Sequence, residues 1–329
     1  MSRRRLKAAA RGARSGGAAA ALAALAIVLG AGCSEDFPPY NRLDGLRVLA
    51  IQSEPAAPLS GQAATLTPLV FTPTADPSLI YQWSWCPAPG PANGGHQCLI
   101  TEDELGALLG PGVPFPPFDL GAAPTAMLEA GLPPELLAAV CGGAVPDLPA
   151  PNCEGGFPVQ VSLTVRTDTD QVDAVVTVRW RFDEASQAAN ANPSVDGLTA
   201  TLAAGPAQSI TDVLDADTLT FPRDAETGIG AVVAPEASET YDGLDDAGLP
   251  ATLRERLFIT WFVETGDSKD THTSYLPDRT PFEAMLNNAW TPAVHRLYPR
   301  PEARLLVVLH DNRGGIGWRS GIVRLEPTP

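Results

Sequence analysis

The sequence predicts a mainly β protein built from two β-sandwich domains, the first of which carries a disulfide-stapled insertion with short helices. Three observations support this class. Apolar and polar residues alternate between residues 159 and 182, a tryptophan strand followed by a closing hairpin occurs twice, and 33 prolines separate short runs rich in Val, Leu and Thr. Alternation with a period of two is typical of strands that bury one face, and frequent prolines indicate many turns.

The first 32 residues have the layout of a secretory signal peptide. Six basic residues lie within the first 14 positions, and Ala18–Leu29 is an uncharged apolar run. This run is too short to span a bilayer as a helix, which needs roughly 20 residues. Small residues at Gly30, Ala31 and Gly32 then leave the backbone before Cys33 accessible to a peptidase.

The junction Leu29-Gly30-Ala31-Gly32-Cys33 resembles the lipobox of bacterial lipoproteins, although Gly30 stands where that family usually has leucine. The resemblance implies that Cys33 is diacylated, that residues 1–32 are removed, and that the new amino group is acylated. Several acyl chains would anchor the protein stably, whereas one chain binds membranes only reversibly. Ser34, in place of aspartate, fits sorting to the outer membrane under the enterobacterial rule for this family. The alternative is an ordinary cleaved signal that leaves Cys33 free.

The number of cysteines agrees with lipidation of Cys33. Five cysteines are an odd number, which leaves one without a partner in an exported protein. Without Cys33, an even set suited to two disulfides remains: Cys86, Cys98, Cys141 and Cys153. Two pairings are open. One joins neighbours, Cys86 to Cys98 and Cys141 to Cys153. The other is nested, Cys86 to Cys153 and Cys98 to Cys141.

Charge argues against nucleic acid as a partner. After removal of the leader, the chain would keep 297 residues with 16 basic and 38 acidic side chains, a net charge of −22. Such a surface repels nucleic acid and anionic lipid headgroups. A chain of this length exceeds what one hydrophobic core usually serves, so two domains are expected.

Residues 33–44 are expected to be the lipidated cysteine and a tether, because SEDFPPYNRLD combines charge with a Pro-Pro pair and has no periodicity. The first domain is then expected over residues 45–190. Three strands are predicted at residues 45–52, 63–71 and 79–86. Alternation in the third strand places Tyr81, Trp83 and Trp85 on one face.

A hairpin closes this domain, since apolar residues alternate with polar ones over residues 159–166 and, after the turn TDTDQ, over residues 172–182. Between the third strand and the hairpin, residues 87–158 are rich in Pro and Gly and are predicted to be the disulfide-stapled insertion. One short helix is expected to begin at a capping box of Thr101 and Glu104 and to end near Gly110. A second is expected from about Pro133 to Gly142.

The second domain is expected over residues 191–329 and repeats this plan. LFITWFV at residues 257–263 aligns with LIYQWSW at residues 79–85, which matches Trp261 with Trp83. The final hairpin, residues 303–327, matches the hairpin at residues 159–182.

The order of strands, a buried tryptophan on the third strand and a closing hairpin resemble the immunoglobulin-like fold. The ending LLVVLHDNRGGIGW…GIVRLEP resembles the last hairpin of polycystic-kidney-disease-type and cadherin-like bacterial modules. With its lipobox, the chain resembles predicted lipoproteins of GC-rich Gram-negative bacteria. The resemblance implies two immunoglobulin-like β-sandwich domains.

No catalytic motif is present: the sequence has no GxSxG, no HExxH, no P-loop and no GxGxxG at a strand–helix junction. One polar set could bind a divalent metal if it converged, because carboxylates and imidazoles are ordinary ligands. It comprises Asp267, Asp270, His272, His310 and Asp311. The simpler interpretation is that Asp, Asn and Gly cap the hairpin turns through side-chain hydrogen bonds.

The tryptophans raise a similar choice between core and contact surface. Trp83 and Trp261 lie on apolar alternating strands and are expected in the two cores. Trp290 and Trp318 lie among turn residues and are the candidates for contact with a partner.

The sequence therefore predicts a non-catalytic envelope protein, exported and lipid-anchored, in the outer membrane of a Gram-negative bacterium. It would act as a binding or assembly module for an envelope protein or a glycan and needs no cofactor. One alternative is a calcium- or carbohydrate-binding adhesion module. Another is a metal-dependent envelope hydrolase built from Asp267, Asp270, His272 and His310.

Overall fold

The structure, a computed structural model, describes residues 40–74, 78–90, 97–129, 131–144, 150–184, 187–202, 205–245, 247–294 and 300–327. The expected signal peptide, Cys33 and residues 34–39 of the tether lie outside the described residues. Tyr40–Pro329 forms one compact unit. Within the described segments, no helix has both the length and the apolar character needed to cross a membrane.

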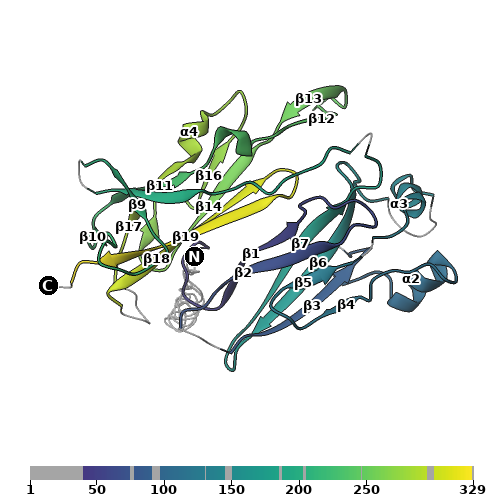
Figure 1. Cartoon of the computed structure of the whole chain (residues 1–329), viewed down its shortest axis with the longest axis horizontal. Coiled ribbons are helices and arrows are strands. Elements are labelled where there is room, and N and C mark those ends of the chain that lie inside the picture. Colours follow the sequence, from purple (N-terminus) through teal and green to yellow (C-terminus); the bar gives the residue numbers. More distant parts are fainter. Residues whose placement is uncertain are drawn as a thin grey trace, which may run out of the picture. The chain divides into compact units, whose positions relative to one another are not determined.

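Strands between residues 47 and 180, here called the first lobe, form two antiparallel sheets (Figure 1). One has the order β1–β2–β5 and the other the order β4–β3–β6–β7. The strands are β1 Arg47–Glu54, β2 Ala64–Phe71, β3 Ile80–Cys86, β4 Asp119–Gly121, β5 Ala126–Leu128, β6 Phe157–Arg166 and β7 Gln171–Trp180.

The core of the first lobe follows from alternation along its strands. Trp83 and Trp85 of β3 are buried together with Leu163 of β6 and Leu66 of β2, which belongs to the opposite sheet. Each indole donates its Nε1–H to a backbone carbonyl, so the buried ring leaves no donor unpaired. The predicted hairpin is confirmed: β6 and β7 pair along their full length.

Strands between residues 197 and 325, the second lobe, form two further sheets, β15–β17–β11–β8–β9 and β10–β19–β18–β14–β16. These strands are β8 Gly197–Thr201, β9 Ala207–Ile210, β10 Thr220–Phe221, β11 Thr227–Val232, β14 Leu257–Val263, β15 Asp267–Ser268, β16 His272–Tyr275, β17 Asn287–Thr291, β18 Glu302–Asp311 and β19 Ile316–Leu325. A separate two-stranded hairpin is formed by β12 Thr240–Leu244 and β13 Pro250–Arg254. The remaining elements are η2 Pro235–Ala237 and α4 Phe282–Met285.

The two lobes repeat one order of strands. In each, the tryptophan strand (β3 or β14) lies between a short strand (β4 or β16) and the first strand of the closing hairpin (β6 or β18). The facing sheet contains β1–β2–β5 in one lobe and β8–β11–β17 in the other. Trp83 pairs with Leu163, and Trp261 pairs with Val307, so the two tryptophans occupy equivalent places. This order is that of an immunoglobulin-like sandwich, and it confirms the expected fold class. The number of domains and their limits, 45–190 and 191–329, stay predictions.

The expected insertion at residues 87–158 is not one continuous insertion. It contributes β4 to one sheet of the first lobe and β5 to the other, and these strands of three residues each are too short to show a periodicity in the sequence. Both predicted helices are present, α2 at Glu102–Leu109 and α3 at Pro134–Cys141. Thr101 and Glu104 form the predicted capping box of α2.

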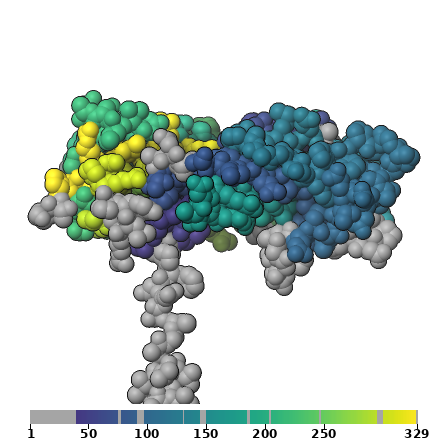
Figure 2. Space-filling view, turned by 90° about the horizontal axis from the view of Figure 1, so that it is seen from below, coloured from purple at the N-terminus to yellow at the C-terminus, as the bar shows by residue number. Residues whose placement is uncertain are grey.

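An apolar cluster joins the lobes. Phe71 of β2 and Ala50 of β1 pack with Phe262, Val308 and Ile316 of the second lobe. In Figure 2, blue atoms of the first lobe lie directly against yellow atoms of the second. The two lobes therefore share a small core of their own.

Polar contacts surround this interlobe core. The guanidinium of Arg304 lies 4.4 Å from the centre of the Phe71 ring, and its Nη2 donates to the carbonyl of Thr72 at 2.8 Å. Asn192, in the segment between the lobes, donates to the carbonyl of Ser53 at 2.8 Å and accepts from the amide of Ile316 at 2.9 Å. This single side chain thus bridges the lobes.

The end of the expected tether belongs to the folded unit, which corrects the predicted range 33–44. Asn41 and Leu43 are buried. The amide of Leu43 donates to the carbonyl of Val263 at 3.0 Å, and the amide of Val263 donates to the carbonyl of Asn41 at 3.0 Å. Backbone pairing with β14 ends any free tether before residue 41.

Candidate functional site

The disulfides join neighbours along the chain. Cys86 bonds to Cys98 and Cys141 bonds to Cys153, each pair separated by 12 residues. This decides between the two pairings that the sequence left open. Each disulfide closes a local loop, and the second lies beside the groove described below.

The five residues of the expected metal set do not form one cluster, so that expectation is wrong. Asp267 lies in β15, in one sheet of the second lobe, whereas His272 and His310 lie in β16 and β18 of the other sheet. The backbone of Asp270 is tied to the amide of Asn288. Throughout the described part of the chain, no group of three or more His, Cys, Asp or Glu side chains could hold a metal ion.

His272 and His310 instead lie beside Phe258 of β14. The imidazole of His310 stacks on the phenyl ring with 4.5 Å between centroids, and that of His272 lies at 6.4 Å. Burial, followed by the charge of His272, lowers the pKa of His310 to about 4. A neutral imidazole therefore stacks on the ring at neutral pH.

Asp311 caps the turn between β18 and β19 through side-chain hydrogen bonds, as the simpler interpretation of the sequence predicted. One carboxylate oxygen accepts hydrogen bonds from the amides of Arg313 and Gly315, at 2.7 and 2.8 Å. The other accepts from Asn190 Nδ2 at 3.1 Å. Asp311 thereby fixes the turn between β18 and β19 and contacts the segment between the lobes.

The expectation that Trp290 contacts a partner is also wrong. Its side chain is 0% exposed, and its Nε1–H donates to the carbonyl of Thr265 at 2.7 Å. It belongs to β17 and packs against Phe221 in the core of the second lobe. Trp318 is half-buried against the interlobe core, and its contact with a partner stays a prediction.

A groove of about 820 Å³ lies between the lobes, and sequence reasoning missed it. We call it the interlobe groove. Five parts of the chain line it: the loop that contains Cys153, strand β7, the segment between the lobes, strand β12, and the turn between β18 and β19. The lining residues are Asn152, Cys153, Glu154, Gly155, Arg179, Gln187, Ala188, Tyr241, Asp242, Gly243, Leu244, Asn312 and Arg313.

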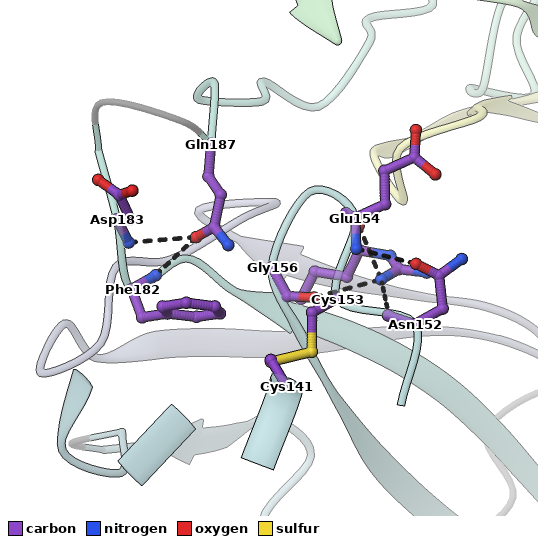
Figure 3. The surroundings of a disulfide bond; sticks show 9 residues. Cys141, Asn152, Cys153, Glu154, Gly156, Phe182, Asp183 and Gln187 are labelled. Carbon is purple, nitrogen blue, oxygen red and sulfur yellow. Dashed lines mark hydrogen bonds between the residues drawn. A yellow bond between two sulfur atoms is a disulfide. The ribbon is translucent and has the colours of Figure 1, made fainter. Parts of the chain in front are cut away.

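The wall from the first lobe is a loop held in place by Arg179 of β7. Its Nη1 donates to three backbone carbonyls, those of Asn152, Glu154 and Gly156, at 3.0–3.3 Å. The disulfide from Cys153 to Cys141 ties the same loop to helix α3 (Figure 3). The loop is therefore fixed by one side chain and one covalent bond before any ligand arrives.

Gln187 closes this side of the groove. Its Oε1 accepts hydrogen bonds from the amides of Phe182 and Asp183, at 2.8 and 3.2 Å (Figure 3). The carboxylate of Glu154 points away from the disulfide in the same view. Glu154 is exposed and presents its charge at the rim of the groove.

The wall from the second lobe centres on Tyr241 of β12. The guanidinium of Arg313 lies 4.5 Å from the centre of its ring, and Asn312 Nδ2 donates to its hydroxyl at 3.3 Å. Tyr241, Glu154, Leu244 and Asn312 also line a second groove of about 300 Å³. Tyr241 thus stands between two adjoining polar grooves.

A cluster of charged groups lies beneath this wall. Arg313 Nη1 donates to Glu255 Oε1 at 3.1 Å and lies 3.8 Å from Glu239 Oε2. Its Nη2 donates to the carbonyls of Ala188 and Ala189. Arg313 therefore joins the β18–β19 turn, the β12–β13 hairpin and the segment between the lobes.

The lining of the interlobe groove offers many groups that can form hydrogen bonds. The residues that form it include no His and no Ser, and the sulfur of Cys153 is held in the disulfide. Amide, guanidinium, phenol and carboxylate groups are suited to hydrogen-bonding a polar ligand.

An apolar cavity of about 200 Å³ lies in the first lobe, between α2, α3 and both disulfide loops. Its lining includes Leu105, Leu136, Val140 and Phe157. Nothing polar among these four could fix the orientation of a ligand, so the interlobe groove is the better candidate site.

No protein-family model and no curated protein matches the chain. Solved structures that are similar include murine CEACAM1b, at 8% identity over 84% of this chain and 98% of that chain, with a TM-score of 0.20. Three N-terminal domains of the outer capsid protein Hoc of bacteriophage RB49 give 11% identity, 87% and 71% coverage, and a TM-score of 0.22. The Yersinia pseudotuberculosis adhesin InvE is 10% identical over 85% of this chain and 60% of that chain, with a TM-score of 0.20. Likenesses this low carry no argument, and the fold is assigned from the strand order alone.

Proposed function

We propose that this protein is a lipid-anchored, non-catalytic binding or assembly module of a bacterial cell envelope, and that the interlobe groove is its binding site. One observation carries the proposal: a groove of about 820 Å³ whose walls are fixed in advance by a disulfide, by Arg179 and by Arg313. Pockets that hold ligands are about 300–1,000 Å³ and largely preformed.

The lining favours a polar ligand, such as a segment of an envelope protein or a glycan. The lining residues include two cationic ones, Arg179 and Arg313, and two acidic ones, Glu154 and Asp242. This balance gives the groove no preference for ligands of one charge. The expected net charge of −22 on the chain makes nucleic acid an unsuitable partner.

Two alternatives are weaker. A hydrolase built from Asp267, Asp270, His272 and His310 lacks support, because the four residues do not converge. Adhesion through carbohydrate remains a second candidate, because amide and guanidinium groups beside Tyr241 and Leu244 can hydrogen-bond sugar hydroxyls. Binding of the purified protein to an array of envelope glycans would support this second candidate. No binding on such an array would favour a protein ligand.

The lipid anchor is supported by the sequence before Tyr40. If Cys33 is lipidated, seven peptide steps separate it from Tyr40 and reach at most about 25 Å. The folded unit would then work close to a membrane surface. Incorporation of a labelled fatty acid, abolished by Cys33→Ala, tests this part of the proposal alone.

The binding site is tested by photo-crosslinking in the native envelope. A photoreactive amino acid at position 242, in the groove, should capture one partner in the full-length tagged protein. The same amino acid at position 213 is the control, because Val213 is 58% exposed and does not line the groove.

A stoichiometric adduct from position 242 and none from position 213 supports the groove as the site. Equal capture from both positions, or capture from position 213 alone, refutes it. Loss of the adduct in a Cys33→Ala background would show that the partner is met only at the membrane.

A further inference from the structure

The β12–β13 hairpin is a wall of the interlobe groove, yet it belongs to neither sheet of the second lobe. Exposed and half-buried residues alternate along both strands, and none is fully buried. A hairpin without a buried face has little hydrophobic burial to hold it. The contacts at its base therefore decide whether it stays against the lobe.

Those contacts converge on Glu255, which directly follows β13. Its side chain is 0% exposed. One carboxylate oxygen accepts from Arg313 Nη1 at 3.1 Å, and the other accepts from the amide of Glu239 at 3.1 Å, just before β12. The carbonyl of Glu255 accepts from Ser238 Oγ at 2.8 Å. Both ends of the hairpin thus meet at one carboxylate.

The charges around Glu255 do not balance. Two carboxylates, those of Glu239 and Glu255, share the guanidinium of Arg313, and a third, that of Asp311, accepts from the backbone amide of the same residue. Asp311 is 5% exposed and Asn190, which donates to it, is 7% exposed. Asn190 Oδ1 is buried and accepts no hydrogen bond from the described residues, so its partial negative charge adds to that of the carboxylates.

The two other cationic side chains of the hairpin, Arg254 and Arg256, are exposed, so solvent screens their charges. Arg254 donates to Ser238 Oγ and to the carbonyl of Pro235. Tyr241 stacks with the guanidinium of Arg313.

A buried excess of negative charge favours uptake of a proton. Burial of the side chain, followed by the charge of Asp311, raises the pKa of Glu255 to about 7, although Arg313 opposes the shift. If the hairpin detached, Glu255 would meet water and regain the ordinary pKa of a glutamate. Detachment therefore releases a proton, and a rise in pH favours it.

We propose that Glu255 is a proton-dependent lock on the β12–β13 hairpin: the protonated side chain holds this wall of the groove in place, and the ionised side chain allows it to detach. The effect on ligand binding rests on the proposed function of the groove. The motion itself does not, so it is tested without a ligand.

The experiment is hydrogen–deuterium exchange of the detergent-extracted, full-length protein at pH 6, 7 and 8. Between pH 6 and pH 8, opening of residues 239–255 should become roughly tenfold more frequent, after correction for the intrinsic exchange rate. Glu255→Gln keeps the size of the side chain and removes its titration. In that variant the change should fall below about twofold.

Glu236→Gln is the matched control. It removes the same charge from an exposed position in η2, three residues before Glu239. This variant should keep the full dependence of exchange on pH. A wild-type hairpin with no dependence on pH, or one that persists in Glu255→Gln, overturns the proposal.

A second measurement needs no variant. The carboxyl carbon of Glu255, followed by NMR in the wild-type protein, should titrate with a midpoint near 7. A midpoint near 4.5 refutes the lock even if Glu255→Gln fails to fold. Failure of the crosslinking experiment would leave both of these results unchanged, so the two proposals fail separately.

Discussion

His310 is a half-buried base whose protonation opposes folding. It stacks on Phe258 as a neutral ring, and burial lowers its pKa to about 4, below the ordinary value of 6.5. The unfolded chain therefore binds this proton more readily than the folded one. The free energy of unfolding should fall as pH drops from 6.5 towards 4, by up to about 3 kcal/mol.

His310→Phe tests that effect, because a phenyl ring can stack on Phe258 and does not titrate. Urea unfolding at pH 7, 5.5 and 4.5 should show that the variant loses less stability than the wild type in this range. Equal losses in both proteins would assign the acid sensitivity to other groups.

Glu255 contributes a dependence of the opposite sign. Its pKa in the folded protein, about 7, lies above the ordinary 4.5. The stability that it contributes is complete below pH 4.5 and is lost as pH rises through 7, by about 2–3 kcal/mol. Measured by urea unfolding between pH 5 and pH 8, Glu255→Gln should become more stable relative to wild type as pH rises. A constant difference across this range would contradict the raised pKa.

At the scale of elements, the two disulfide loops form a matched pair. Each closes a loop with a separation of 12 residues, but only Cys141–Cys153 holds a wall of the interlobe groove. A disulfide that closes such a loop lowers the entropy of the unfolded chain. It thereby raises the free energy of unfolding by about 3 kcal/mol. The two disulfides should therefore contribute similarly to the free energy of unfolding and differently to binding in the groove.

The double variants Cys141→Ser/Cys153→Ser and Cys86→Ser/Cys98→Ser test this difference. Both should lower the melting temperature by similar amounts in thermal unfolding. Only the first should abolish the adduct formed from position 242, because it alone frees the loop that Arg179 and the disulfide fix. Loss of the adduct in both variants would mean that global stability, rather than the wall of the groove, controls binding.

At the scale of the whole molecule, the interlobe core should make the two lobes unfold together. Phe71 is 1% exposed, and it packs against the second lobe beneath Arg304. Phe71→Ala should cost about 3–5 kcal/mol. It should also split one calorimetric transition into two, because each lobe keeps its own core.

Phe71→Leu is the control for that experiment. It keeps most of the apolar contact and removes only the ring beneath the guanidinium, so one transition should remain. A single transition in Phe71→Ala, or two transitions in the wild type, would show that the interlobe core does not couple the lobes.

Sequence by itself determined the features that depend on neighbours along the chain. Alternation placed Trp83 and Trp261 in their cores, the Thr101–Glu104 capping box set the start of α2, and the repeated tryptophan strand and hairpin indicated two similar lobes. Each signal is local: a period of two requires only a strand with one buried face, and a capping box requires only four consecutive residues.

Tertiary structure alone decided the features that depend on residues far apart in the chain. Strand pairing put Asp267 in a different sheet from His272 and His310, and packing in the second lobe buried Trp290 despite its turn-rich surroundings. The interlobe groove joins the loop at residue 154, strand β12 and the turn at residue 313, and no period in the sequence links them. Burial of Glu255 beside Asp311 and Arg313 likewise joins residues that are far apart in the chain. Local preference acts over a few residues, whereas a binding site and a shifted pKa arise from groups that only the completed fold brings together.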